Sequence, residues 1–330
     1  MPAAADTLRI ATFAAPLSRD GPGLLLRDLG REDDQIDAVL AIIAEIGPDI
    51  LLLTDFDHDM EGRALAAFAA RAGYAHWFAN PPNTGLMTDQ DLDQNGKLGE
   101  PRDAQGYGRF RGDGGMAVLS RWPIGEVTDY SAMLWQDLPG ATLPEGWPDE
   151  VHAIQRLSHG GHWVVPVAAP GGAVNLMAYS ASPPVFDGPE DRNGLRNRDE
   201  LRLWSWVLDQ DAPENFVVLG NANLDPVDGQ GYSTAMVDFL NDPRLQDPQP
   251  RSKGGDLAAD PDHNGDPALD TADWRDGAPG NLRVSYVLPA ATWDVKGAGV
   301  YWPAPDEASL LGEDGLLAGP HRLVWVDVSR

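Results

Sequence analysis

The apolar run at residues 49–54, DILLLT, constrains the fold of this chain more than any other feature. An apolar run without polar alternation is typical of a β-strand buried on both faces, which occurs in sheets that helices cover. A helix is predicted just before it, over residues 34–46, because apolar residues recur there at helical spacing and Asp33 or Asp34 suits the N-cap. The sequence therefore predicts an α/β fold.

Strands and helices alternate along the rest of the chain. We expect further strands at 8–13, 115–120, 164–167, 175–179, 216–219, 283–288 and 323–328, and further helices at 63–72, 198–208 and 233–240. No internal linker or repeat interrupts this pattern, and 330 residues can form one large α/β domain. We predict an N-terminal tail at residues 1–7 and a single domain over residues 8–330. Two long acidic loops are expected in it, at about 80–115 and 246–280.

Charge and composition limit the function. The chain has 24 Lys and Arg residues against 51 Asp and Glu residues, a net charge of −27 that disfavours binding to nucleic acid. It has no cysteine, which excludes disulfides, thiolate metal sites and cysteine nucleophiles. No segment approaches the ~20 apolar residues of a transmembrane helix.

Polar side chains follow the carboxyl ends of several predicted strands or precede the last one. Ligand groups collect at this edge of α/β sheets, so the shared position predicts a common site. The residues are Asp55, Asp57, Asp59, Ser180, Ser182, Asn221, Asn223 and His321.

Five segments resemble the endonuclease/exonuclease/phosphatase superfamily, in a bacterial secreted branch. They are LRIATF at 8–13, GPDILLLTDFDHD at 47–59, SPPVFDGPEDRNGLRN at 182–197, VVLGNANLDPVDG at 217–229 with LRVSYVLP at 282–289, and HRLVWVDV at 321–328. The resemblance implies a four-layer αββα sandwich, in which two mixed sheets pack face to face between helices. With the acidity and the lack of cysteine, it also implies a periplasmic or secreted protein whose signal peptide has been removed.

The resemblance implies a phosphoesterase site built around a divalent metal, with an Asp as general base, a His that is backed by an Asp and binds a phosphoryl oxygen, and a second His after the middle strand. This sequence departs from that pattern at most positions. At the metal, Ala14 replaces the assisting Asn and Asp55 replaces the metal-binding Glu. Ser180 replaces a His, and Asn221 replaces the general base. Near His321, Ser285 replaces the Asp that would orient this histidine, and Pro320 replaces the Asp that would precede it. Asn223 and His321 match the pattern.

These replacements favour a catalytically inactive member of the superfamily, a pseudoenzyme that binds an unidentified protein partner or ligand or has a structural role. Acidic and imidazole groups become neutral or small, which removes metal affinity and proton transfer together. The alternative is a retuned metal-dependent phosphoesterase that uses Asp55, Asn223 and His321. That enzyme would require Mg²⁺.

Both acidic loops contain the oxygen-donor spacing of a calcium-binding loop, DLDQNGK at 91–97 and DPDHNGD at 260–266. The bidentate Glu of a regular EF-hand is missing from the first, which has Arg102 at that position and Asp103 next. We expect structural Ca²⁺ in these loops; the alternative is a solvated turn. The expected ligands are Asp91, Asp93, Asn95 and Asp103 in the first loop, and Asp260, Asp262, Asn264 and Asp266 in the second.

His159 and His162 flank two glycines ahead of a predicted strand. Two histidines at this spacing could bind a transition metal. We interpret them instead as histidines of the turn that leads into the strand.

Overall fold

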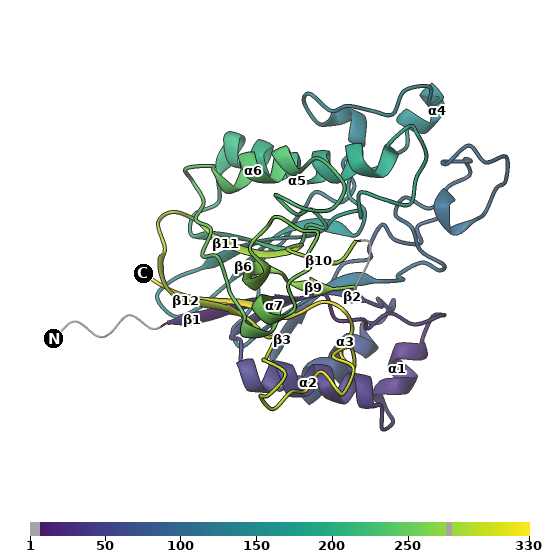
Figure 1. Cartoon of the computed structure of the whole chain (residues 1–330). Helices are drawn as coiled ribbons and strands as arrows, with labels where there is room; N and C mark the ends of the chain where they lie inside the picture. The colour runs from purple at the N-terminus through teal and green to yellow at the C-terminus, as the bar shows by residue number, and fades with distance from the viewer. Residues whose placement is uncertain (1–6, 275–278) are drawn as a thin grey trace.

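Two mixed β-sheets pack face to face, and helices cover their outer faces (Figure 1). The computed structural model describes residues 7–274 and 279–330. In spatial order, the first sheet contains β12 (Asp294–Val300), β13 (Val324–Ser329), β1 (Leu8–Phe13), β2 (Ile50–Phe56), β4 (Gly115–Ser120) and β3 (His76–Phe78). The second contains β11 (Ser285–Pro289), β8 (Phe216–Asn221), β7 (Val174–Ser180), β6 (Gly161–Val167) and β5 (Thr128–Asp129). The αββα sandwich is therefore confirmed.

Helices from two parts of the chain form the outer layers (Figure 1). The first sheet is covered by α1 (Leu24–Leu29), α2 (Asp34–Ile46) and α3 (Arg63–Ala72), and the second by α5 (Arg192–Asp211) and α6 (Ser233–Leu240). Shorter elements lie in the connections: α4 (Asp149–His152), α7 (Lys253–Leu257), the 3₁₀ helices η1 (Pro101–Asp103), η2 (Trp135–Asp137) and η3 (Pro267–Leu269), and the paired strands β9 (Ala272–Asp273) and β10 (Asn281–Leu282). Among the described helices, none combines the length and apolarity needed to cross a membrane.

The apolar run that opened the sequence analysis forms the centre of the first sheet. Leu51, Leu52 and Leu53 of β2 are fully buried, since β1 and β4 flank the strand within the sheet. The predicted cap of α2 is also present, because the Asp33 side chain accepts a hydrogen bond from the Ile36 amide at 2.9 Å.

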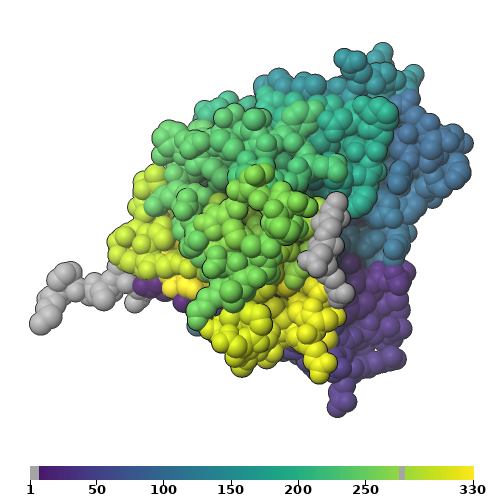
Figure 2. All heavy atoms as spheres, in the orientation of Figure 1, coloured from purple at the N-terminus to yellow at the C-terminus, as the bar shows by residue number. Residues whose placement is uncertain are grey.

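The structure differs from the sequence prediction in two segments. Helix α5 begins at Arg192, six residues before the expected start at 198. The residues of its first turns are polar and buried, and they form hydrogen bonds with backbone carbonyls elsewhere in the chain, so apolar spacing does not mark them. The expected loop at 246–280 contains α7, η3 and β9, which pack against the C-terminal part of the chain (Figure 2). The predicted tail at residues 1–7 lies outside the described residues except for Thr7.

Candidate functional site

The strand ends of both sheets open into one cavity of about 930 Å³. Strands β1 and β2 run parallel in one sheet and β7 and β8 in the other, so their carboxyl ends meet at the same edge of the sandwich. Among the positions that line the cavity are six that the family resemblance assigns to the phosphoesterase site: Ala14, Asp55, Ser180, Asn221, Asn223 and His321. The structure thus brings together residues that are more than 300 positions apart in sequence.

Ser285 and Pro320 lie beside this cavity rather than in its lining. Ser285 is buried and pairs with Asn221 across β11 and β8. The carbonyl of Pro320 accepts a hydrogen bond from the Asp273 amide at 2.9 Å, which fixes the residue before His321 against β9.

A β-bulge directs Asp55 into the cavity. The pairing of β2 with β4 shifts between Thr54 and Phe56, and Asp55 has a left-handed backbone with φ of 61°. Burial raises the pKa of the Asp55 carboxyl to about 7, and the charges of Asp57 and Asp113 add to that rise, while a hydrogen bond with Ser18 lowers the pKa. Asp55 is therefore a carboxyl group that a nearby cation would stabilise in its charged form.

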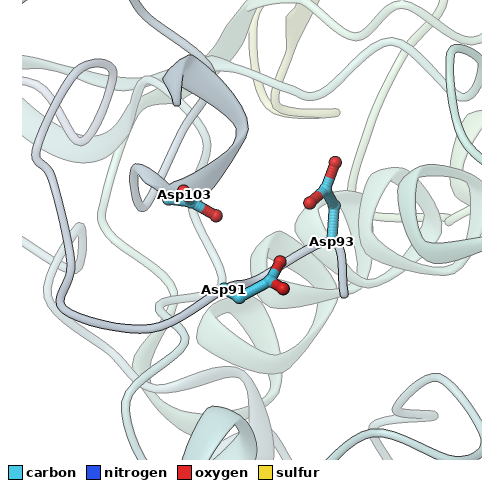
Figure 3. A group of neighbouring side chains, drawn as sticks. All are labelled: Asp91, Asp93 and Asp103. Carbon is cyan, nitrogen blue, oxygen red and sulfur yellow. The ribbon is translucent and has the colours of Figure 1, made fainter. Parts of the chain in front are cut away.

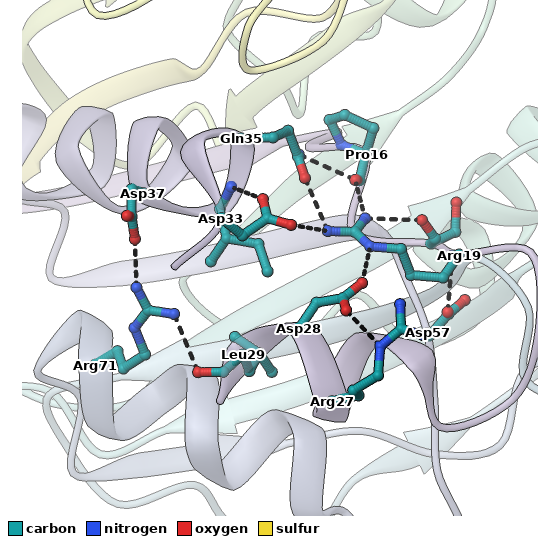
Figure 4. Close-up of polar contacts among 12 residues, drawn as sticks. Pro16, Arg19, Arg27, Asp28, Leu29, Asp33, Gln35, Asp37, Asp57 and Arg71 are labelled. Carbon is teal, nitrogen blue, oxygen red and sulfur yellow. Dashed lines mark hydrogen bonds and ion pairs between the residues drawn. The ribbon is translucent and has the colours of Figure 1, made fainter. Parts of the chain in front are cut away.

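The loop after β1 is held beside Asp57 by a polar network around Arg19 (Figure 4). The Arg19 amide donates to the Asp57 carboxylate at 2.9 Å, and the Arg19 side chain bonds Asp28 and Gln35 of α1 and α2 at 3.2 and 2.9 Å. This network fixes the loop that leads away from Ala14, and it uses Arg19 for structure rather than leaving it free for a ligand.

His321 is held at the cavity wall by an aromatic contact. Its ring lies edge-on to Trp274 at a centroid distance of 5.2 Å, and its Nδ1 has no hydrogen-bond partner in the described part of the chain. Burial lowers the pKa of His321 to about 4, and the charge of Arg322 acts in the same direction. The imidazole is thus neutral near pH 7.

Asn221 and Asn223 complete the far side of the cavity. The Asn223 side chain donates to the Ala181 carbonyl at 2.8 Å, which links the ends of β7 and β8. The Asn221 side-chain oxygen accepts from the Asn223 amide at 3.3 Å. Neither amide can act as a general base near pH 7.

Comparison with known proteins identifies the family of this chain. A sequence model described as the Endonuclease/Exonuclease/phosphatase family matches residues 21–315. The chain belongs to this family. A search of curated proteins found no match.

Solved structures of the endonuclease/exonuclease/phosphatase type share the fold at low sequence identity. An endonuclease/exonuclease/phosphatase from Beutenbergia cavernae DSM 12333 aligns with a TM-score of 0.58 and 19% identity, over 98% of this chain and 71% of that one. A family protein from Leptotrichia buccalis C-1013-b gives 0.54 and 14%, over 98% and 100% of the two chains. Sphingomyelinase C from Streptomyces griseocarneus gives 0.52 and 16%, also over 98% and 100%. These identities show a common fold.

In this family member, the first acidic loop gathers three carboxylates. One ligand oxygen each from Asp91, Asp93 and Asp103 lies within 4.8 Å of the other two, and the three side chains point toward a common space (Figure 3). Asn95 lies beside them and donates to Asp93 at 3.0 Å. Oxygen donors in this arrangement are the kind that Ca²⁺ accepts.

The second acidic loop does not gather its carboxylates in the described structure. Asp266 forms an ion pair with Arg251 at 2.6 Å and caps η3, so its oxygens are already used. Asp260 and Asp262 line the large cavity instead, and the Asn264 amide donates to Asp228 at 2.9 Å. The equal spacing of the two motifs therefore leads to different structures.

Sequence reasoning missed Glu200, Arg192 and the position of His159. Glu200 is buried and accepts from the amides of His159 and Ser182, both at 2.6 Å, and burial raises its pKa to about 7. His159 lines the large cavity and, through its contact with Glu200, is fixed there. Arg192 was missed because α5 begins before the predicted helix at 198–208. Glu200 lies inside that predicted helix, but apolar spacing does not mark a buried carboxyl group.

Proposed function

We propose that this chain is a catalytically inactive member of the endonuclease/exonuclease/phosphatase family that works by binding. The observation that carries the proposal is the content of the cavity at the strand ends. Its lining includes Ala14, Ser180 and Asn221, where the family resemblance implies an Asn, a His and the general base. The loss of one positioned general base alone typically lowers a rate by about 10²–10⁴.

The unpartnered polar atoms near the cavity support this proposal. Ser285 Oγ and His321 Nδ1 are both buried without a hydrogen-bond partner among the described residues. An aspartate at position 285 would offer a charged acceptor to a histidine, whereas serine does not. A neutral His321 also stabilises a phosphoryl oxygen less than an imidazolium would.

The size of the cavity supports binding as the retained role. A volume of about 930 Å³ is within the range of small-molecule sites, and the lining combines Pro183, Pro184 and Trp274 with polar groups. A ligand or a segment of a protein partner therefore has room at the strand ends.

Calcium is part of the proposal as a structural ion in the loop at 89–103. Asp91, Asp93 and Asp103 would supply carboxylate oxygens, and Asn95, whose side-chain nitrogen donates to Asp93, lies beside them. The ion would offset the mutual repulsion of the carboxylates and order an otherwise irregular loop.

A hydrolysis assay tests the proposal. The protein is incubated with bis-p-nitrophenyl phosphate and p-nitrophenyl phosphate in Mg²⁺, Mn²⁺ or Ca²⁺, beside a His321→Ala variant. We expect no metal-dependent rate that distinguishes the two proteins. A metal-dependent rate that is lost in the variant would replace this proposal with the alternative, a Mg²⁺-dependent phosphoesterase that uses Asp55, Asn223 and His321.

A further inference from the structure

A second cavity of about 660 Å³ lies next to the one at the strand ends. Its walls come from the loop at 89–103, the segment before α5 and the first turn of α5. It shares His159, Pro183 and Phe186 with the large cavity, so the two are neighbours. Its volume is typical of a site for a small molecule.

Arg192, the first residue of α5, supplies a buried positive charge to this second cavity. The residue is only 8% exposed, and its Nε has no hydrogen-bond partner. The one hydrogen bond of its guanidinium among the described residues runs from Nη1 to the Leu92 carbonyl, at 3.4 Å, and no carboxylate there lies within 4.0 Å of it. A buried charge without a partner is unfavourable, so free donors at a cavity wall favour an anionic ligand.

Arg196, one helical turn further along α5, shows what a structural arginine looks like in this fold. Its guanidinium is fully buried and donates to the carbonyls of Gln105, Leu157 and Ser158 at 2.6, 2.7 and 2.9 Å. Its donors are therefore used within the protein, whereas the Arg192 guanidinium makes one long hydrogen bond and leaves its Nε without a partner.

The surroundings of Arg192 favour a ligand with one anionic group. The ring of Trp147 lies 5.3 Å from the guanidinium, and the N-terminus of the 20-residue helix α5 adds a positive potential. Asp93, Asp187 and Glu190 line the same cavity, and the Asp187 carboxylate accepts from the Asn193 amide. Asp93 forms an ion pair with Arg102 at 3.7 Å, so Asp187 and Glu190 are the carboxylates that would repel a second anionic group of the ligand.

Two exposed aromatic rings lie at the mouth of the cavity. Phe186 is 77% exposed and has a left-handed backbone with φ of 71°, a conformation that is strained for a bulky residue. Tyr107 is 53% exposed and lines the same cavity. A strained backbone that keeps a phenyl ring in solvent favours a role in contacting a planar ligand.

We propose that this second cavity binds a small planar molecule with one anionic group, which Arg192 binds while the ring of the ligand packs against Phe186. The anionic group is an aryl carboxylate or an aryl phosphate, since both present oxygens to a guanidinium. The site uses none of the replaced catalytic positions. The proposal for this second cavity is therefore independent of the result of the hydrolysis assay.

Isothermal titration calorimetry on the full chain tests this site, with benzoate, phenyl phosphate, cyclohexanecarboxylate and inorganic phosphate as probes. We expect benzoate or phenyl phosphate to bind at least threefold more tightly than both non-aromatic probes, and the tighter of the two identifies the group. No heat of binding from either aryl anion at millimolar concentration overturns the proposal. Equal affinity for benzoate and cyclohexanecarboxylate overturns the role of the planar ring.

Variants separate a ligand-binding role of Arg192 from a structural one. Arg192→Met should weaken binding of the aryl anion about tenfold to a hundredfold, and Phe186→Ala about threefold to tenfold. Without ligand, Arg192→Met should melt no lower than the original protein, because it removes an unpaired buried charge. Arg63→Met, at an exposed arginine of α3, controls for the change in net charge and should leave affinity unchanged. Arg192→Lys, which keeps the charge, should retain measurable binding. If Arg192→Met binds the aryl anion with unchanged affinity, or if its melting temperature falls strongly, Arg192 has a structural role and the proposed site is overturned.

Discussion

Ser285 lies directly opposite Asn221 in the antiparallel pairing of β11 with β8. Both side chains are buried and neutral, although the family resemblance implies a carboxylate at each position. Two carboxylates on adjacent strands would raise each other's pKa and would attract a cation or an imidazolium. The neutral pair removes that negative charge from the ends of β8 and β11.

Restoring one carboxylate should change the titration of His321. We expect Ser285→Asp to raise the pKa of His321 from about 4 toward its ordinary value near 6.5, because a carboxylate stabilises the imidazolium. The shift is measured by the pH dependence of the His321 ring signals in NMR spectra. Ser285→Asn is the matched control without a charge and should leave the pKa low. An unchanged pKa in the Asp variant would mean that position 285 does not orient His321.

Asp55 should make the stability of the protein depend on pH. The unfolded carboxyl ionises near 3.8, whereas the folded one keeps its proton up to about 7. Its contribution to stability is therefore present at low pH and is lost as the pH rises from about 4 to 7. In chelator, Asp55→Asn should be more stable than the original protein at pH 8 by up to about 4 kcal/mol, and equal to it near pH 4.

Thermal melting from pH 4 to 8 checks this prediction, with Glu126→Gln as the control at an exposed carboxylate. The control should show no pH-dependent gain. If the Asp55→Asn variant is less stable than the original protein at pH 8, the prediction is wrong, and the folded state stabilises the charged form of Asp55.

Six substitutions together should restore metal binding at the strand ends. The variant combines Ala14→Asn, Asp55→Glu, Ser180→His, Asn221→Asp, Ser285→Asp and Pro320→Asp. We expect tighter Mg²⁺ binding by calorimetry and detectable hydrolysis of bis-p-nitrophenyl phosphate, because both sheets that hold these positions are intact. The same variant with His321→Ala should bind Mg²⁺ and hydrolyse little. A folded variant that fails to bind Mg²⁺ would mean that these positions do not form the family's metal site.

Calcium should stabilise the protein through the loop at 89–103. An ion that binds only the folded state adds about 2.7 kcal/mol at a hundredfold excess over Kd, and each kcal/mol raises the melting temperature by about 2–4 °C. Melting is measured in chelator, in millimolar Ca²⁺ and in millimolar Mg²⁺. Asp91→Ala with Asp93→Ala should abolish most of the rise. The control variant, Asp260→Ala with Asp262→Ala, lies in the loop that does not gather its carboxylates and should keep the calcium-dependent rise in melting temperature. Equal rises with Ca²⁺ and Mg²⁺ would instead indicate general charge screening.

Local patterns were enough to predict the central elements and the edge of the sheets that holds the cavity. The bounds of α2 and α3 and the burial of β2 follow from apolar spacing, caps and a continuous apolar run, which depend on neighbours in sequence. The convergence of Asp55 and Asn221 was also predictable, because both follow strands whose carboxyl ends lie at the same edge. His321 joins them because it precedes β13, which runs antiparallel to β1.

Tertiary contacts decided what local patterns could not. The motifs at 91–97 and 260–266 have the same donor spacing, yet only the first gathers carboxylates, because Asp266 pairs with Arg251. Helix α5 starts early because its buried polar residues bond to carbonyls far away in sequence, as Arg196 does to Gln105.

The amino-acid sequence by itself determined the α/β class, through the spacing of apolar residues along the chain, and its resemblance to the family implied the sandwich. Only the tertiary structure decided that Arg192 is buried without an ion pair beside a second cavity. The physical reason is that burial and pairing depend on which distant segments pack together, as when Leu92 meets the start of α5 across 100 positions of sequence.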